Sequence, residues 1–148
     1  MVLLYILIAL ALIFDFLNGF HDSSNIVATI IFSRAMSPRK ALYMTAVAEF
    51  SGPFLFGVAV AKTIGEDIVL PGSINIWVLV AALIASIFWN LFTWYFGIPS
   101  SSSHALIGGI IGAVAADSGF GVIQTSGIIK VAIALFISPI LGLSLIHI

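Results

Sequence analysis

Apolar residues fill the chain in five runs, and turn-forming and charged residues gather in the breaks between them. A run of about 20 apolar residues is long enough to cross the hydrocarbon core of a bilayer as a helix. The first run starts without the Lys or Arg of a signal peptide, so we interpret it as a retained membrane segment. The pattern predicts an all-α integral membrane protein, a polytopic helical bundle in which residues 1–148 form a single membrane domain. Its segments are expected at 2–33, 41–61, 74–96, 104–116 and 128–146.

Two of these segments have lengths that do not fit a simple span. The run 2–33 would be about 48 Å long as one helix at 1.5 Å per residue, whereas the hydrocarbon core is about 30 Å thick. Polar residues cluster around Asn18, Gly19 and His21, so we predict a broken first helix with a hinge near 18–22. The run 104–116 would reach only about 20 Å, which predicts a half-helix or one arm of a re-entrant hairpin.

The composition supports a membrane protein and excludes several other classes. Of 148 residues, 61% are hydrophobic and 7% are charged, whereas about a quarter of the residues of a soluble domain are charged. This balance excludes a soluble enzyme and a disordered chain. The sequence contains no basic patch of the kind that binds nucleic acid, and it contains no cysteine for disulfides.

Charge in the loops predicts the orientation of the chain. Arg34, Arg39 and Lys40 form a basic cluster, which the positive-inside rule places in the cytoplasm. The N-terminus is then expected outside. The following loop, which carries Lys62 and the acidic pair Glu66–Asp67, is also expected outside.

Ionisable side chains at membrane depth are costly and are therefore candidates for function. Asp22 and Asn25 are three residues apart, so on a helix they share a face and could offer oxygens to a hard cation. Hydrogen bonds that hold helices together are the alternative role for such groups. Glu49 in the second segment is expected to be protonated, paired or bound to a cation. Asp15 and Asn90 are expected to have packing roles.

A second polar motif, Pro99–His104, precedes the short segment. Its four serines, Ser100–Ser103, are good helix N-cap residues. A helix N-terminus presents unpaired N–H groups and a partial positive charge, which favour an anion. An ordinary cap at the membrane interface explains the same residues.

Together the two motifs favour cation-coupled anion transport. A carboxylate repels a nearby anion unless a proton or metal ion lies between them, so Na⁺ or H⁺ is expected as the coupling ion and no other cofactor. Discontinuous helices around a midplane site are the usual architecture of secondary transporters. Three alternatives stay open: sulfate or another tetrahedral anion as substrate, an intramembrane serine hydrolase using Ser100–Ser103 with His104, and a structural membrane subunit without transport.

Two stretches resemble the signatures of the inorganic phosphate transporter (PiT) family. Residues 18–40, NGFHDSSNIVATIIFSRAMSPRK, resemble its first signature, and residues 97–112, GIPSSSSHALIGGIIG, resemble its Pro-x-Ser-x-Thr/Ser-His motif with the glycines that follow. Where much of the family has Gly-Ala-Asn-Asp-Val-Ala-Asn, this chain has Gly19-Phe20-His21-Asp22-Ser23-Ser24-Asn25. This Phe-His-Asp variant resembles the bacterial low-affinity branch. Family members use either Na⁺ or H⁺, so the coupling ion stays open.

The resemblance implies roles for individual residues. Asp22 and Asn25 match the positions that bind substrate and coupling ion, and Glu49 falls where the family requires an acidic residue. Ser101, Ser103 and His104 match the second motif, in which Ser100 and Ser102 hold variable positions. The implied phosphate-binding residues are Asp22, Asn25, Ser101, Ser102, Ser103 and His104; the implied coupling-ion residues are Asp22, Asn25 and Glu49; and the implied hinge residues are Asn18, Gly19 and His21.

The family is built from two inverted repeats, each with one copy of the signature. This chain contains one copy, so the resemblance implies that it is the N-terminal half of a transporter that works by alternating access in the plasma membrane. The expected partners are inorganic phosphate, the lipid bilayer, and either the C-terminal repeat or a second copy of the chain as a homodimer.

Overall fold

The computed structural model describes residues 1–56 and 67–146 of the chain. Helices dominate this part, and its one β interaction is an isolated bridge between Val69 and Ile123. The elements follow the order α1 (Val2–Phe32), α2 (Pro38–Phe56), α4 (Ile76–Phe96), α5 (Ser102–Ser118), a 3₁₀ turn η2 (Phe120–Val122) and α6 (Thr125–Ile146). The predicted all-α membrane architecture is confirmed.

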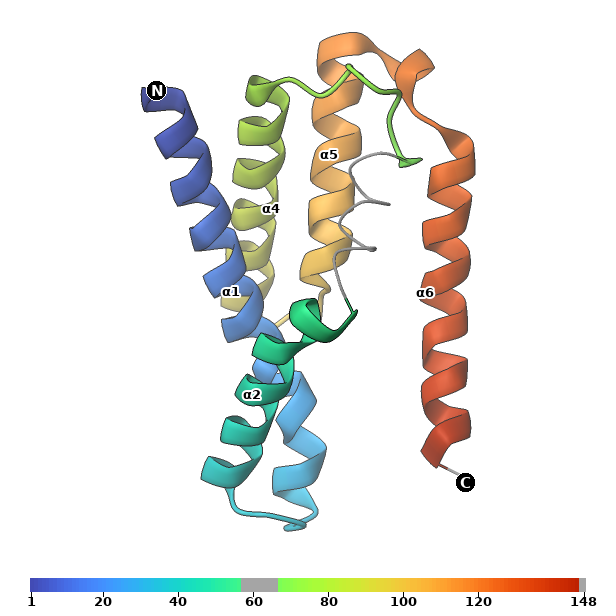
Figure 1. Ribbon diagram of the computed structural model, residues 1–148. Coiled ribbons are helices and arrows are strands. Elements are labelled where there is room, and N and C mark those ends of the chain that lie inside the picture. The colour runs from blue at the N-terminus through green and yellow to red at the C-terminus, as the bar shows by residue number, and fades with distance from the viewer. Residues whose placement is uncertain (57–66, 147–148) are drawn as a thin grey trace.

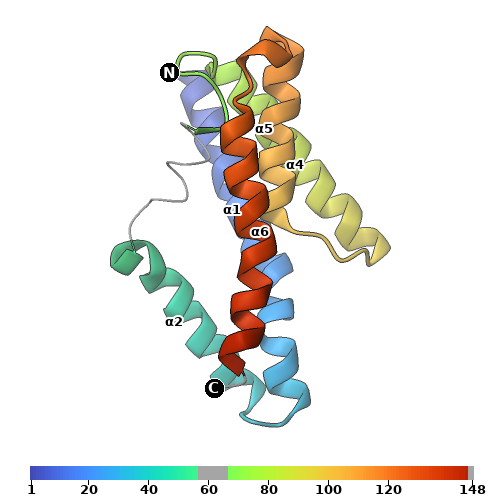
Figure 2. The ribbon, with the colours of Figure 1, turned by 90° about the vertical axis from the view of Figure 1, so that its right-hand side faces the viewer.

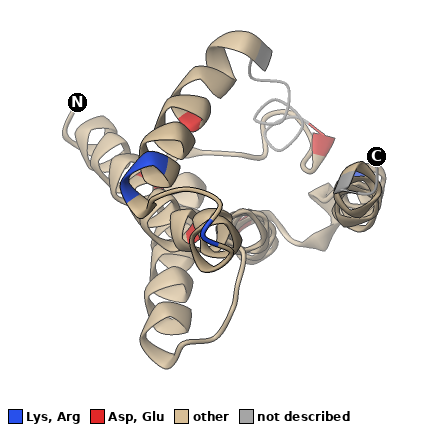
Figure 3. Ribbon diagram, turned by 90° about the horizontal axis from the view of Figure 1, so that it is seen from below, with Lys and Arg blue, Asp and Glu red and all other residues tan. Residues whose placement is uncertain are grey.

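Consecutive helices alternate in direction along the long axis of the molecule (Figure 1). α1, α4 and α6 run from the end that carries the N-terminus toward the opposite end, and α2 and α5 run back. The α1–α2 turn, with the basic residues of the predicted cytoplasmic loop, therefore lies at the end opposite to the N-terminus. Viewed from that end, most of the ribbon carries no charged residue (Figure 3).

Helix α1 corrects the prediction of a broken first helix. It is one continuous α-helix from Val2 to Phe32, and Asn18, Gly19 and His21 all lie inside it. A glycine in a helix interior costs only about 1 kcal/mol relative to alanine, whereas every backbone group freed by a break needs another partner inside the membrane. The cluster of polar residues therefore did not mark a hinge in this structure.

The other segments match the expected runs with shifted ends. α1, α4 and Thr125–Leu145 of α6 are each long and apolar enough to span a membrane. α2 covers the start of the expected 41–61 segment, whose last residues, 57–61, lie outside the described residues. Lys62 and Glu66 of the expected outer loop also lie outside them. α5 has 17 residues and is longer than the expected 104–116 arm. Whether it is re-entrant in a bilayer stays a prediction.

α4 and α5 form an antiparallel hairpin, which is the core of the described chain (Figures 1 and 2). Its buried apolar cluster contains Val78, Ala82, Ile110 and Val114, joined by Ile68 and Val69, and Leu83 of α4 is buried as well. At mid-length, a Cβ added to Gly109 would lie 2.7 Å from both Ala82 O and Ser86 Oγ. The two helix backbones therefore approach each other as closely as only glycine permits.

Polar contacts fasten the hairpin at both ends. Asn75 caps α4 by accepting hydrogen bonds from the N–H groups of Trp77 and Val78 at 2.9 and 3.0 Å. Its Nδ2 also donates to Asp117 Oδ2 near the end of α5, at 3.2 Å. At the other end, Thr93 Oγ1 lies 3.2 Å from Ser100 Oγ in the connecting loop. α4 ends at Gly97, which adopts the left-handed conformation with φ 64°.

α6 stands apart from the other helices (Figures 1 and 2). Near its start, Gly127 packs against the backbone of Asp67, and Lys130 Nζ donates to Asp67 Oδ2 at 3.1 Å. Large apolar side chains point outward along it, including Phe136, Ile140 and Leu145. Such exposure is expected where lipid or other protein surrounds the helix.

Candidate functional site

The start of α5 meets α1 near the middle of α1 through Ser102, while α4 packs along α1 as well, with Phe20 against Trp94. Ser102 is the first residue of α5 and is fully buried. Its Oγ donates to Asp22 Oδ2 at 2.8 Å and also lies in hydrogen-bonding contact with Asn18 Oδ1. A hydroxyl has only one proton, so this proton is shared between two acceptors. The contact is therefore rich in oxygen acceptors and poor in donors.

An open cavity of about 770 Å³ lies beside this contact, between α1 and α2. Three carboxylates line it: Asp15 and Asp22 from α1 and Glu49 from α2. The described residues that line it include no Lys or Arg; they are Asp15, Asn18, Gly19, Asp22, Ile26, Ala46, Glu49, Phe50, Pro53 and Phe54. The cavity therefore presents negative charge, which attracts cations and repels an uncompensated anion.

The structure brings Glu49, Asp22 and Asp15 to one cavity, and the coupling-ion roles that the resemblance implied for Glu49 and Asp22 stay predictions. Asp15, Asn18 and Asp22 are spaced by three and four residues on α1, which places them on one helix face. This spacing is visible in the sequence, although we interpreted Asp15 as a packing residue. Within residues 1–56 and 67–146, no three His, Asp or Glu side chains converge in a geometry that would hold a metal ion. The carboxylates line the cavity without forming a closed cage.

Asn25 does not share that cavity. Its side chain is exposed and lines a separate cavity of about 520 Å³, together with Thr93 and Pro99 near the α4–α5 loop. α1 is helical here, so Asp22 and Asn25 are three residues apart on one helix face, and their joint binding of an ion stays a prediction.

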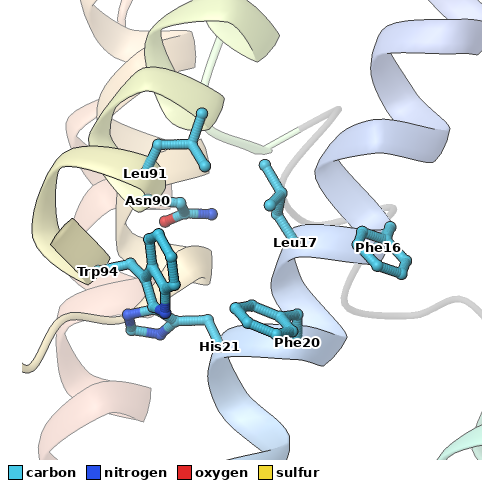
Figure 4. Close-up of a pocket in the computed structure, with 7 residues that line it drawn as sticks. All are labelled: Phe16, Leu17, Phe20, His21, Asn90, Leu91 and Trp94. Atoms are coloured by element: carbon cyan, nitrogen blue, oxygen red, sulfur yellow. The ribbon is translucent and has the colours of Figure 1, made fainter.

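His21 connects the Ser102 contact to the space between α1 and α4. Its Nδ1 lies 3.5 Å from Asp22 Oδ1, and the side chain is 11% exposed. The ring lines the cavity that contains Asn25 and also a smaller cavity against α4 (Figure 4). The residue predicted as a hinge thus lies beside the key carboxylate.

The four serines have four different environments. Ser100 contacts Thr93, and Ser101 caps α5 by accepting from the N–H of His104 at 3.4 Å. Ser102 reaches α1, whereas Ser103 is exposed. Because Ser101 uses its hydroxyl within its own helix, the residue that joins the two motifs is Ser102, at a position variable in the family signature.

His104 is exposed and lines a third cavity, of about 430 Å³, with Trp89 and Gly108. Its backbone N–H donates to Ser101 Oγ, and among the described residues no serine hydroxyl is hydrogen-bonded to the His104 ring. The pairing of nucleophile and base that a serine hydrolase needs is therefore not assembled here.

Sequence reasoning missed Thr93 of α4 and assigned Asn90 of the same helix only a packing role. Thr93 is fully buried and holds Ser100 in place, and Asn90 is 2% exposed with no hydrogen-bond partner for either amide atom among the described residues. Both lie in an apolar run, three residues apart on one helix face. A polar pair at that spacing in a membrane helix was the available signal.

Apolar helices long enough to span a membrane, with carboxylate, amide and hydroxyl groups in contact between them, are typical of polytopic membrane proteins that move solutes. Comparison with known proteins specifies the class: the chain belongs to the phosphate transporter family, which matches residues 18–147. This is a family of transporters and not of enzymes, and the expected resemblance is confirmed.

Individual relatives agree with the family. A "Probable low-affinity inorganic phosphate transporter" of Bacillus subtilis strain 168 is 48% identical over 147 residues, covering 96% of this chain and 43% of the relative. A protein of the same description from Rhizobium meliloti strain 1021 is 49% identical over 136 residues, covering 92% and 41%. A low-affinity inorganic phosphate transporter of Escherichia coli strain K12 is 42% identical over 153 residues, covering 95% and 31%.

The chain spans less than half the length of these three relatives. No solved structure gives a significant match to it.

Proposed function

We propose that the complete protein carries inorganic phosphate across the plasma membrane together with Na⁺ or H⁺, and that this chain supplies its N-terminal repeat. The family and the names of the relatives support phosphate as the substrate. The coupling ion, the second repeat and the alternating-access mechanism are parts of the proposal. The basic α1–α2 loop supports a cytoplasmic position for that loop and an outside N-terminus.

One observation carries the mechanism: Ser102, at the start of α5, shares its single proton between Asn18 and Asp22. The first turn of α5 offers N–H groups without intrahelical partners, which suit a phosphate oxygen. The adjoining cavity offers carboxylates, which suit a cation. Anion and cation therefore have neighbouring places, and each lowers the electrostatic cost of binding the other.

The acidic cavity favours phosphate over sulfate. Phosphate can share a proton with a carboxylate near neutral pH, whereas sulfate cannot. In transport, the cation would enter between Asp22 and Glu49 and neutralise the cavity, and phosphate would then bind toward Ser101–His104. The N-terminal repeat would move against the C-terminal repeat, or against a second copy of this chain in a homodimer, to expose the site on alternate sides.

The test is uptake of radiolabelled phosphate into proteoliposomes that contain the complete protein, with a Na⁺ gradient, a pH gradient or neither. We expect uptake driven by one gradient and abolished by Asp22→Asn. Asp117→Asn is the matched control, because Asp117 lies at the far end of α5. Folded wild-type protein without phosphate uptake under either gradient would contradict the proposal. Stronger uptake of sulfate, or equal competition by sulfate, would assign the site to another tetrahedral anion.

A further inference from the structure

Residues 67–70, which we call the strap, lie beside the chain that joins α5 to α6 (Figure 1). Two backbone hydrogen bonds hold the strap to this junction. The N–H of Leu70 donates to Val122 O at 2.9 Å, and the N–H of Gln124 donates to Ile68 O at 2.8 Å. A segment far away in the sequence is therefore fastened at the point where α5 ends and α6 begins.

Burial of apolar side chains adds to these bonds. Ile68 and Val69 of the strap are 0% and 1% exposed. They belong to the same apolar cluster as Val114 of α5, and Ile128 and Val131 of α6 pack against that cluster. The strap therefore connects the start of α6 to the α4–α5 hairpin, and its removal would expose two fully buried side chains.

Gly127, in the first turn of α6, lets the strap approach the helix backbone. A Cβ added to Gly127 would overlap Asp67 O and would lie 2.9 Å from Ile68 Cα. Lys130 Nζ also pairs with Asp67 Oδ2 at 3.1 Å, but the two side chains are 63% and 39% exposed. Exposed ion pairs contribute little to stability. The strap is therefore held by backbone contact and burial more than by charge.

We propose that the strap is a fixed joint, which stays closed while the transporter works and makes the start of α6 move together with the α4–α5 hairpin. Opening the strap would break both backbone bonds and expose Ile68 and Val69. Segments that open readily in native proteins have few buried apolar contacts, and the strap is the opposite case. The role in transport rests on the proposed function, whereas the closure of the strap does not.

A closed strap also bears on the route of the solute. It leaves no passage between the end of α5 and the start of α6 at its own height. The acidic cavity lies on another side of the hairpin, between α1 and α2. Solute is therefore expected to reach Asp22 from the α1–α2 side, without passing the strap.

Val69 and Ile123 allow a direct test with a disulfide. The two flanking bonds make them a non-hydrogen-bonded antiparallel pair. The Cα atoms of such a pair lie about 4.5 Å apart, which is within the range that a disulfide bridges. The chain has no cysteine of its own. In the complete protein with Val69→Cys and Ile123→Cys as its only cysteines, we expect the disulfide to form and phosphate uptake to be equal in the oxidised and reduced protein.

Thiol labelling tests whether the strap stays closed during transport. The two single variants are Val69→Cys, at a position 1% exposed, and the control Phe120→Cys, at a position 79% exposed near the same junction. We expect a water-soluble maleimide to react with Val69→Cys at least about tenfold more slowly than with Phe120→Cys. The rate at Val69→Cys should be the same with and without phosphate and a Na⁺ or pH gradient.

Two glycines of α6 provide a matched pair for the joint. Gly127→Ala should push the strap away, so labelling of Val69→Cys should become at least about tenfold faster in this background. At Gly142 nothing lies within 4 Å of an added Cβ, so Gly142→Ala should leave the labelling rate unchanged. Lys130→Gln should also leave it unchanged, because the exposed ion pair holds the strap only weakly.

Three results would overturn the inference. One is failure of the disulfide to form under oxidising conditions. Another is phosphate uptake that is lost in the oxidised protein and restored by a reductant, because the strap would then open in each cycle. The third is labelling of Val69→Cys that is as fast as that of Phe120→Cys, or that accelerates when phosphate and a gradient are added. Absence of phosphate uptake in the wild type would contradict the proposed function, and disulfide formation and labelling of the resting protein would still test the closed strap.

Discussion

Ser102 Oγ, at the start of α5, donates a hydrogen bond of 2.8 Å to Asp22 Oδ2, at the middle of α1. Eighty positions of sequence separate the two residues. This bond joins the acidic motif of the first helix to the serine motif of the hairpin, so it is the link on which the proposed site depends.

Removal of the Ser102 hydroxyl is expected to weaken both the fold and the function. Ser102→Ala leaves Asp22 and Asn18 without their shared partner at a buried position, which should cost about 1–3 kcal/mol of stability. Phosphate uptake should fall in parallel. The thermal unfolding midpoint and the uptake rate of the complete protein measure the two effects. Ser103→Ala, at an exposed serine of the same turn, should change neither the midpoint nor the fold.

Neutralisation of Glu49 is expected to affect the coupling ion more than the fold. Glu49 is exposed to the α1–α2 cavity, so Glu49→Gln should leave the unfolding midpoint within about 0.5 kcal/mol of wild type. The ion concentration for half-maximal uptake should rise at least about tenfold, because the cavity loses one of its carboxylates. Ion-titrated uptake measures this shift. An unchanged ion dependence would remove Glu49 from the site.

Adjacent glycines of α5 provide a matched pair for the packing of the hairpin. Gly109→Ala would place a Cβ 2.7 Å from Ala82 O and should cost about 1–3 kcal/mol. At Gly108 nothing lies within 4 Å of the added Cβ, so Gly108→Ala should gain up to about 1 kcal/mol from helix propensity. Unfolding midpoints of the two variants should therefore move in opposite directions. Equal shifts would show that α4 and α5 are less closely packed.

The continuity of α1 can be tested at Gly19. The added Cβ of Gly19→Ala has no neighbour within 4 Å, and alanine is the better helix former, so we expect a gain of about 0.5–1 kcal/mol. Unfolding of the purified protein measures the gain. A loss of stability would mean that the native helix bends at this point, as the polar cluster had suggested.

The sequence predicted the architecture well because membrane helices are set mainly by the length and polarity of each run. It did not predict that α1 continues as a helix through its polar residues. Asn18 and His21 were interpreted as a break in the backbone, whereas their side chains reach sideways to Ser102 and into the cavities while the helical hydrogen bonds continue. Polar residues in a membrane helix can serve either purpose, and the choice depends on a partner from another part of the chain.

The serine motif shows the same limit. Four consecutive serines do not indicate at which of them the helix begins. The sequence alone therefore does not assign the direction in which each serine side chain points. Once α5 begins at Ser102, Ser101 becomes its cap and Ser102 faces α1. Thr93 was missed for a related reason: its role depends on Ser100 across from it, and this contact is known only when the α4–α5 loop is placed.

The hairpin is fastened at three heights: by Asn75 and Asp117 at one end, by Gly109 against Ala82 at mid-length, and by Thr93 and Ser100 at the other end. Contacts at three positions along their length resist both the sliding of α4 against α5 and the separation of the two helices. A movement of the whole hairpin against α1 would therefore separate Ser102 from Asp22 and also displace Asp117, at the opposite end of α5.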